Sequence, residues 1–251
     1  MSSSDRTETT LEPILRVAGA RVRYKNGATG ISDVTINACP GQVTAIFGPN
    51  GAGKTSTLRA ISGFMRAERV KVTGEITLGG QNITGLEPHE VMRRGLAFVP
   101  ERTKVFARMT VRENLDMAAR ESSKARRREL MDGVLELFPA LTGRMKEHAG
   151  RLSGGQQQML AIARALISGA SMLVIDEMTL GLHQDLHRPL FGVIKDIASS
   201  GTAVLVVDES TSAALEVADH CYLLRGGKVR MSGPPSLYVG NELLAAGYVE
   251  D

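Results

Sequence analysis

The stretch of this chain with the clearest chemistry is a glycine-rich run between a strand-like and a helix-like segment. It comprises Gly48, Pro49, Asn50, Gly51, Ala52, Gly53, Lys54, Thr55 and Ser56. Glycines allow successive backbone N–H groups to turn inward around a polyphosphate, and a helix N-terminus adds donors and a partial positive charge. Lys54 is placed to reach the β- and γ-phosphates of a nucleotide, and the Thr55 hydroxyl to ligate Mg²⁺. The run therefore predicts a site for a nucleotide with Mg²⁺.

Two adjacent carboxylates follow a second apolar run. Residues 172–175 (MLVI) form the run, and Asp176 and Glu177 come directly after it. The last side chains of a parallel strand face the crevice where ligands bind. Asp176 is then placed to hold Mg²⁺ through water, and Glu177 to orient or deprotonate an attacking water. Taken alone, the pair could be solvated acids at the end of a strand. Together with a phosphate loop, it is better interpreted as part of a site for hydrolysis.

A third motif, LSGGQ at residues 152–156, precedes a helical pattern. Ser153 is a candidate N-cap, and Gly154 and Gly155 permit close approach of the backbone to a ligand. Taken alone, the motif is also compatible with a capped turn.

The elements that position these motifs are predicted from the apolar pattern. Short strands are expected between residues 14 and 78, and helices between residues 87 and about 168. The continuous apolar runs at residues 172–175 and 203–207 are typical of buried parallel strands, and residues 222–231 of a closing hairpin. The pattern predicts one α/β domain with a helical insertion. The helical segments are expected at residues 111–120, 124–138 and 156–166.

Composition restricts the class of protein further. The chain has 251 residues, is 43% hydrophobic and carries a formal net charge of +3, a bias too weak to indicate nucleic-acid binding. No apolar run approaches the ~18 residues of a membrane span, and Cys39 and Cys221 show neither metal nor disulfide spacing. Residues 1–12 are expected to be a disordered tail rather than a signal peptide. We therefore expect a cytosolic protein with no nucleic-acid partner.

In this order and at these spacings, GPNGAGKTS, LSGGQ and VIDE resemble the nucleotide-binding subunits of ATP-binding cassette (ABC) transporters. The resemblance covers nearly the whole chain from about residue 14. It implies a P-loop NTPase (RecA-like) fold with a parallel core sheet, an antiparallel β subdomain and a helical insertion subdomain. The ATPase domain would span residues 13–251, with the insertion at about residues 87–168. The implied ligands are ATP and Mg²⁺, and the implied activity is ATP hydrolysis.

The resemblance also implies roles for particular residues. Tyr24 stands where the family carries an aromatic residue that stacks on adenine, although it also fits an ordinary strand-end tyrosine. Glu101 stands where a glutamine senses the γ-phosphate and Mg²⁺, and a carboxylate ligates Mg²⁺ well. Such ATPases dimerise head to tail, so the LSGGQ motif would act on the nucleotide of a partner subunit. The residues concerned are Ser153, Gly154, Gly155 and Gln156.

Within the family, the chain is most similar to the shorter ATPase subunit of branched-chain amino acid importers. The supporting stretches lie at residues 97–101, 134–139, 152–165 and 179–182. This similarity implies a peripheral ATPase at the cytoplasmic face of the cell membrane, bound to permease subunits and a second ATPase subunit, and served by a solute-binding protein. Importers of urea or short amides use similar subunits. In such importers the binding protein and the permeases select the cargo, so the resemblance implies that this chain does not determine it.

Besides Glu101, three further positions depart from the general family pattern. Met178 replaces a proline, His183 replaces an aspartate, and Glu209 stands where a histidine or glutamine contacts the γ-phosphate. A carboxylate about 4 Å from a phosphate oxygen would be repelled by about 4 kcal/mol at an effective dielectric constant of about 20. We hypothesise that this chain's own site hydrolyses ATP slowly while its LSGGQ motif serves a competent partner. A nucleotide-binding subunit with a regulatory role is the alternative.

The permease is expected to dock near residues 101–112. Phe106, Met109 and Val111 would supply apolar contacts there, unless they belong to the core.

Overall fold

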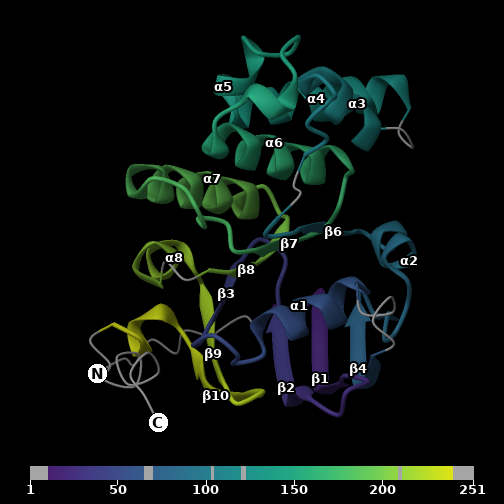
Figure 1. Cartoon of the computed structure of the whole chain (residues 1–251), viewed down its shortest axis with the longest axis vertical. Coiled ribbons are helices and arrows are strands. Elements are labelled where there is room, and N and C mark those ends of the chain that lie inside the picture. The colour runs from purple at the N-terminus through teal and green to yellow at the C-terminus, as the bar shows by residue number, and fades with distance from the viewer. Residues whose placement is uncertain (1–10, 65–69, 103–104, 120–122, 209–210, 240–251) are drawn as a thin grey trace, which may run out of the picture.

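The computed structural model describes residues 11–64, 70–102, 105–119, 123–208 and 211–239. Within these residues, ten strands form one mixed sheet in the order β5-β4-β1-β2-β10-β9-β3-β8-β7-β6 (Figure 1). The strands are β1 (Leu15–Arg23), β2 (Thr29–Ala38), β3 (Val43–Phe47), β4 (Lys71–Leu78), β5 (Gln81–Asn82), β6 (Leu96–Val99), β7 (Met172–Asp176), β8 (Ala203–Val207), β9 (His220–Arg225) and β10 (Lys228–Gly233).

Strands β9, β3, β8, β7 and β6 pair in parallel and form the core of the sheet. Every residue of β3, β7 and β8 is buried, as expected for parallel strands covered on both faces. The predicted strands at residues 43–47, 172–175 and 203–207 are therefore confirmed, and their carboxyl ends meet at one edge of the sheet.

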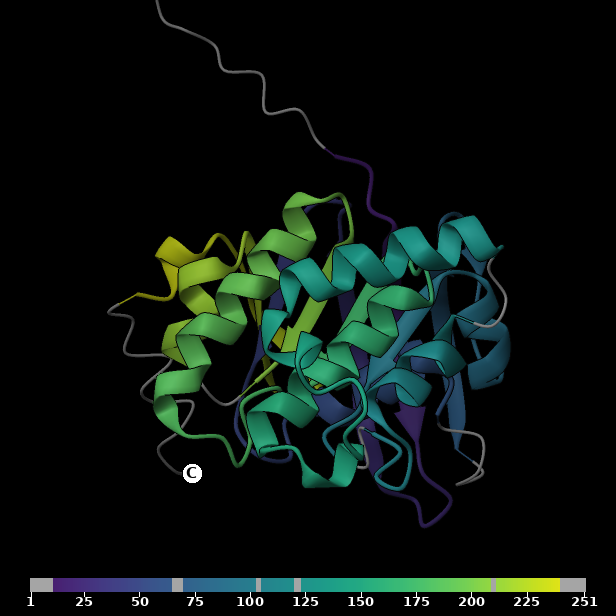
Figure 2. The ribbon, with the colours of Figure 1, turned by 90° about the horizontal axis from the view of Figure 1, so that it is seen from above.

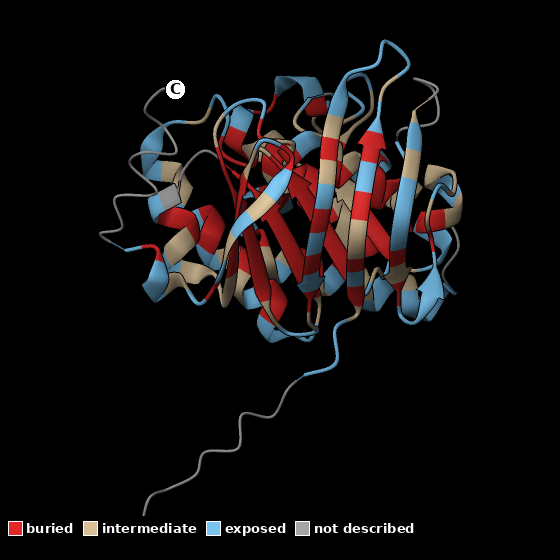
Figure 3. Ribbon diagram, turned by 90° about the horizontal axis from the view of Figure 1, so that it is seen from below, coloured by how far each residue is buried: buried red, intermediate tan, exposed pale blue. Residues whose placement is uncertain are grey.

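The remaining strands pair in antiparallel fashion. β1 lies between β2 and β4, β5 extends β4, and β9 and β10 form the predicted hairpin. Along β1 and β2, buried and more exposed residues alternate, whereas the core strands are buried throughout (Figure 3). A single parallel pairing between Lys228 and Asp33 joins the two parts of the sheet.

Helices cover both faces of the sheet (Figures 1 and 2). α1 packs against β1 and β2, while α4, α6 and α7 lie across the other side. The described helices are α1 (Lys54–Ser62), α2 (Pro88–Arg93), α3 (Val111–Ala118), α4 (Lys124–Leu137), α5 (Pro139–Thr142), α6 (Gly154–Ile167), α7 (His187–Ser199) and α8 (Thr211–Val217). Among the described residues, no helix combines the length and hydropathy needed to cross a bilayer.

One strand lies inside the stretch whose pattern predicted helices only. Residues Leu96–Val99 form β6, which pairs in parallel with β7 along its whole length. The helices predicted at residues 111–120, 124–138 and 156–166 are present as α3, α4 and α6. The strand was missed because a four-residue apolar run does not distinguish strand from helix without knowledge of its partner.

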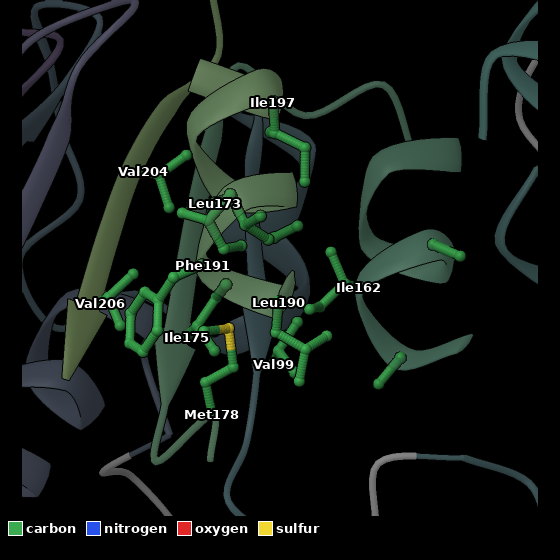
Figure 4. Packing of buried hydrophobic residues seen from close by; sticks show 14 of the residues in the cluster. Val99, Ile162, Leu173, Ile175, Met178, Leu190, Phe191, Ile197, Val204 and Val206 are labelled. Carbon is green, nitrogen blue, oxygen red and sulfur yellow. The ribbon is translucent and has the colours of Figure 1, made fainter. Parts of the chain in front are cut away.

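Two apolar clusters hold the layers together. In one, Ile162 of α6 and Leu190 of α7 pack over Leu173 and Ile175 of β7 (Figure 4). The other lies between α1 and the antiparallel strands and includes Leu58, Ile61 and Ile76. These clusters fix the elements from which the candidate site is built.

Candidate functional site

The glycine-rich run forms the turn between β3 and α1. Gly53 precedes the helix with φ of 104°, a left-handed conformation that a side chain disfavours. A Cβ on Gly48 would lie 2.2 Å from the Leu224 carbonyl oxygen, and one on Gly53 would lie 2.7 Å from the Gly30 carbonyl oxygen. The loop is therefore packed so closely against neighbouring backbone that both positions require glycine.

The loop opens into a pocket of about 340 Å³ that also receives two carboxylates from other elements. Eight of the predicted loop residues, from Pro49 to Ser56, line it together with the predicted residues Glu101 and Glu177. The other described residues that line the pocket are Thr29, Gly30 and Leu180. The sequence did not predict a role in the site for these three residues. The pocket thus combines backbone N–H groups, an ammonium group, hydroxyls and carboxylates. This donor set fits a magnesium-bound triphosphate.

Lys54 lies buried at the start of α1, and its ammonium group points back into the loop. Nζ donates to the carbonyl oxygens of Gly48 at 2.7 Å and Pro49 at 3.3 Å. Its charge is therefore held inside the curve of backbone that would surround a phosphate.

Tyr24 lies beside the loop but is not among the residues that line the pocket. Its hydroxyl is 2.8 Å from Ser56 Oγ, and its ring is so close to Gly30 that a Cβ there would lie 2.7 Å from Tyr24 Cε2. This geometry places Tyr24 at the edge of the site. Its role in stacking on adenine stays a prediction.

The two adjacent carboxylates stand at the carboxyl end of β7. Asp176 is buried and pairs with Val207 of β8. Glu177 has φ of 48°, and it is the only non-glycine residue with positive φ in the described part of the chain. Its amide donates to the Val207 carbonyl oxygen at 2.8 Å. The backbone of Glu177 is therefore strained and held at an edge of the pocket.

Glu101 follows β6 and lines the same pocket, where it forms an ion pair of 2.9 Å with Arg102. Together with the Thr55 hydroxyl, the carboxylates provide oxygen atoms of the kind that Mg²⁺ binds.

The LSGGQ residues cap α6 instead of lining this pocket. Ser153 Oγ accepts from the Gln156 amide, and Gln156 Oε1 accepts from the Ser153 amide at 3.1 Å, which is a capping box. Ser153 and Gly154 are exposed. A Cβ on Gly155 would lie 2.9 Å from Leu186 Cδ1, so a side chain at this position would require the Leu186 side chain to shift. Within the described residues, nothing covers Ser153 and Gly154, so a ligand bound to another protein molecule could contact them.

The positions that depart from the family pattern have different environments. Met178 is fully buried in the apolar cluster beside β7, so packing accounts for an apolar residue there. His183 is exposed and its Nδ1 lies 3.1 Å from Asp185 Oδ2. Glu209 lies outside the described residues.

The surface expected to contact the permease is only partly apolar. Phe106 is 45% exposed, with the Arg164 guanidinium 4.4 Å from its ring centre. Met109 is half-buried, but Val111 is fully buried. Val111 therefore belongs to the core and is unavailable as a docking contact.

Comparison with known proteins identifies the family to which this site belongs. Residues 31–180 match the family described as ABC transporter. The chain belongs to the ABC transporter ATPase family. Members of this family hydrolyse ATP, work with membrane permeases and dimerise.

Individual relatives extend over nearly the whole chain. The high-affinity branched-chain amino acid transport ATP-binding protein BraG of Pseudomonas aeruginosa is 35% identical over 226 residues, covering 90% of this chain and 95% of its own length. The lipopolysaccharide export system ATP-binding protein LptB of Haemophilus influenzae is 30% identical over 224 residues, covering 87% and 90%. The ADP conformation of MJ1267, an ATP-binding cassette of an ABC transporter, superimposes with a TM-score of 0.83 at 25% identity, covering 96% of this chain and all of MJ1267. The predicted P-loop NTPase fold is confirmed.

Proposed function

We propose that this ABC ATPase couples MgATP hydrolysis to import of branched-chain amino acids through membrane permeases. The observation that supports this proposal most is the meeting of the phosphate loop, Glu101 and Glu177 around one pocket. The similarity to BraG supports the choice of cargo. LptB is an export component of comparable similarity, so the direction of transport is part of the proposal.

In the proposed reaction, the loop amides and Lys54 hold the phosphates, and Glu177 orients or deprotonates the attacking water. Thr55 and Glu101 would ligate Mg²⁺ and Asp176 would hold it through water, and the ion would neutralise charge on the phosphate oxygens. Tyr24 would stack on adenine.

Assembly at the membrane belongs to the same proposal. In this proposal the ATPase domain spans residues 13–251, with the helical insertion at about residues 87–168. The exposed LSGGQ residues of one subunit complete the site of a second ATPase subunit, which is either a second copy or a related chain. The domain binds permease subunits at the cytoplasmic face of the membrane, and a solute-binding protein delivers the cargo.

Uptake by cells of the source organism tests the transport proposal. Replacing the chain with its Glu177→Gln variant should abolish uptake of labelled leucine, isoleucine and valine while leaving urea uptake unchanged. Loss of urea uptake alone would assign the amide cargo, and unchanged uptake of all four would contradict the import proposal.

The alternative of a slow, regulatory site depends on Glu209. We propose that its negative charge near the γ-phosphate slows hydrolysis, as the sequence alone suggests. Glu209→Gln should then raise the rate of ATP turnover by the complex of the chain with its permease and ATPase partners. An unchanged rate would refute the proposal.

A further inference from the structure

We propose that Asp208 is a positioning residue for ATP hydrolysis, acting through Thr179 to hold the backbone of Glu177. Asp208 is the residue that directly follows β8, and Thr179 lies two residues beyond Glu177. The inference rests on the proposed catalytic role of Glu177, and it assigns a role to two residues that no motif indicated.

The contact between Asp208 and Thr179 uses both oxygens of the carboxyl group. The Thr179 amide donates to Oδ2 at 2.8 Å, and the Thr179 hydroxyl donates to Oδ1 at 2.6 Å. Asp208 is 1% exposed and Thr179 is 6% exposed. A buried carboxyl group is costly unless its oxygens are hydrogen-bonded, and hydrogen bonds to an ionised acceptor are about twice as strong as neutral ones. This contact is therefore a firm link between the end of β8 and the segment after β7.

The backbone of Glu177 is held on both sides by contacts to β8 and to Asp208, the residue that follows β8. Before it, Asp176 pairs with Val207, and the Glu177 amide itself donates to the Val207 carbonyl oxygen. After it, the Met178 side chain is buried beneath α7 (Figure 4), and Thr179 is bound to Asp208. A left-handed conformation is unfavourable for a non-glycine residue, and it persists only where the surroundings enforce it.

The link also reaches the wall of the pocket. Leu180 follows Thr179 directly, is 47% exposed and lines the phosphate-loop pocket together with Glu177. Loss of the Asp208–Thr179 contact would therefore loosen two residues that line the pocket, Glu177 before Thr179 and Leu180 after it. Since a carboxylate displaced by about 1 Å can lower a rate about 100-fold, the expected effect is on the hydrolysis step.

Isosteric variants of both partners separate positioning from folding. Thr179→Val keeps the shape and removes the hydroxyl donor, whereas Thr179→Ser keeps the donor. Asp208→Asn preserves two hydrogen bonds, because its amide oxygen accepts from the Thr179 amide and its NH₂ group donates to the hydroxyl. Asp208→Ala removes both bonds.

We would measure kcat for MgATP, the Kd of ATP and the melting temperature of the full chain. We expect Asp208→Ala to lower kcat about 100-fold and Thr179→Val about tenfold, with the Kd of ATP within about twofold of wild type. Thr179→Ser and Asp208→Asn should keep most of the activity. The double variant Asp208→Ala/Thr179→Val should be no slower than Asp208→Ala alone, because both changes remove the same contact.

Two controls decide between failure of this inference and failure of the proposed function. If Glu177→Gln abolishes turnover but Thr179→Val turns over like wild type, or Thr179→Ser is as slow as Thr179→Val, the positioning role is refuted alone. If turnover survives Glu177→Gln, or wild type shows none, the proposed role of Glu177 fails and the inference fails with it. A kcat loss that merely follows a lower melting temperature would also overturn the positioning role.

Discussion

At the scale of single residues, the proposed phosphate site contains a buried cation held by backbone oxygens. Lys54 Nζ donates to the carbonyl groups of Gly48 and Pro49, so the ammonium group is placed before any ligand arrives. Preorganisation of this kind reduces the free-energy cost of ordering a side chain on binding.

Removal of that cation should weaken nucleotide binding. We expect Lys54→Ala to raise the Kd of ATP at least tenfold, because charge-assisted hydrogen bonds to phosphate are lost. Lys54→Arg should not restore binding, since a planar guanidinium does not fit the place of an ammonium group. Titration calorimetry measures both, with Lys71→Ala, an exposed lysine on β4, as control. Wild-type affinity in Lys54→Ala would contradict this role.

A second residue-scale prediction concerns the buried thiol of Cys221. Burial, with a smaller contribution from Asp219, raises the pKa of Cys221 to about 12. Because the thiol loses its proton at lower pH in the unfolded chain, stability is retained below the ordinary pKa of the thiol and falls as pH rises towards about 12. We expect the melting temperature to decrease over this range less in Cys221→Ala than in wild type. Equal pH dependence of the two proteins would count against a perturbed thiol.

At the scale of elements, the turn of the β9–β10 hairpin is hydrogen-bonded to the glycine-rich loop. The Gly227 amide donates to the Ala52 carbonyl oxygen at 3.0 Å, and the Gly227 carbonyl accepts from the Ser32 amide at 2.8 Å. The turn of this hairpin therefore connects the loop with β2.

Two neighbouring glycines in this turn provide a matched test. Gly226 and Gly227 have φ of 58° and 71°, but a Cβ on Gly226 meets nothing within 4 Å, whereas one on Gly227 would lie 3.0 Å from Ile31 Cα. Both positions have a positive φ that strains an alanine, but only Gly227→Ala also meets backbone, so only this variant should displace the loop and raise the Kd of ATP, by about tenfold. Equal Kd values for the two variants would show that the turn does not support the loop.

The elements also show how far local sequence predicts structure. Motifs such as residues 48–56 carry their own turn and helix start, so the loop was predictable. Contacts between distant segments were not: the pairing of β6 with β7, and the hydrogen bonds from Thr179 to Asp208, depend on the order of strands in the sheet. The family resemblance predicted Tyr24 as a candidate site residue, but it did not predict the hydrogen bond between the hydroxyls of Tyr24 and Ser56.

At the scale of the whole molecule, the phosphate-loop pocket and the LSGGQ residues are separate sites. In the described residues, none of Ser153, Gly154, Gly155 or Gln156 lines the pocket that contains Lys54 and Glu177. A dimer arranged head to tail would bring the exposed Ser153 and Gly154 of one subunit to the pocket of the other.

Complementation between two inactive variants tests this arrangement. Lys54→Ala removes the cation that binds phosphate in the pocket, and Ser153→Arg blocks the LSGGQ motif. A homodimer of either variant should therefore be inactive. In a mixture, one site of each mixed dimer has an intact pocket and an intact motif, so turnover should return. A mixture as inactive as its components would argue against completion of the site by a second copy.

We propose that the pocket hydrolyses ATP with Glu177 as its catalytic carboxylate. The most direct measurement is MgATP turnover by the purified full chain beside its Glu177→Gln variant, with the Kd of ATP measured for both. We predict that turnover in the variant falls at least 100-fold while the Kd stays within about twofold, because Glu177 acts on the attacking water. Equal turnover in the two proteins would contradict the account.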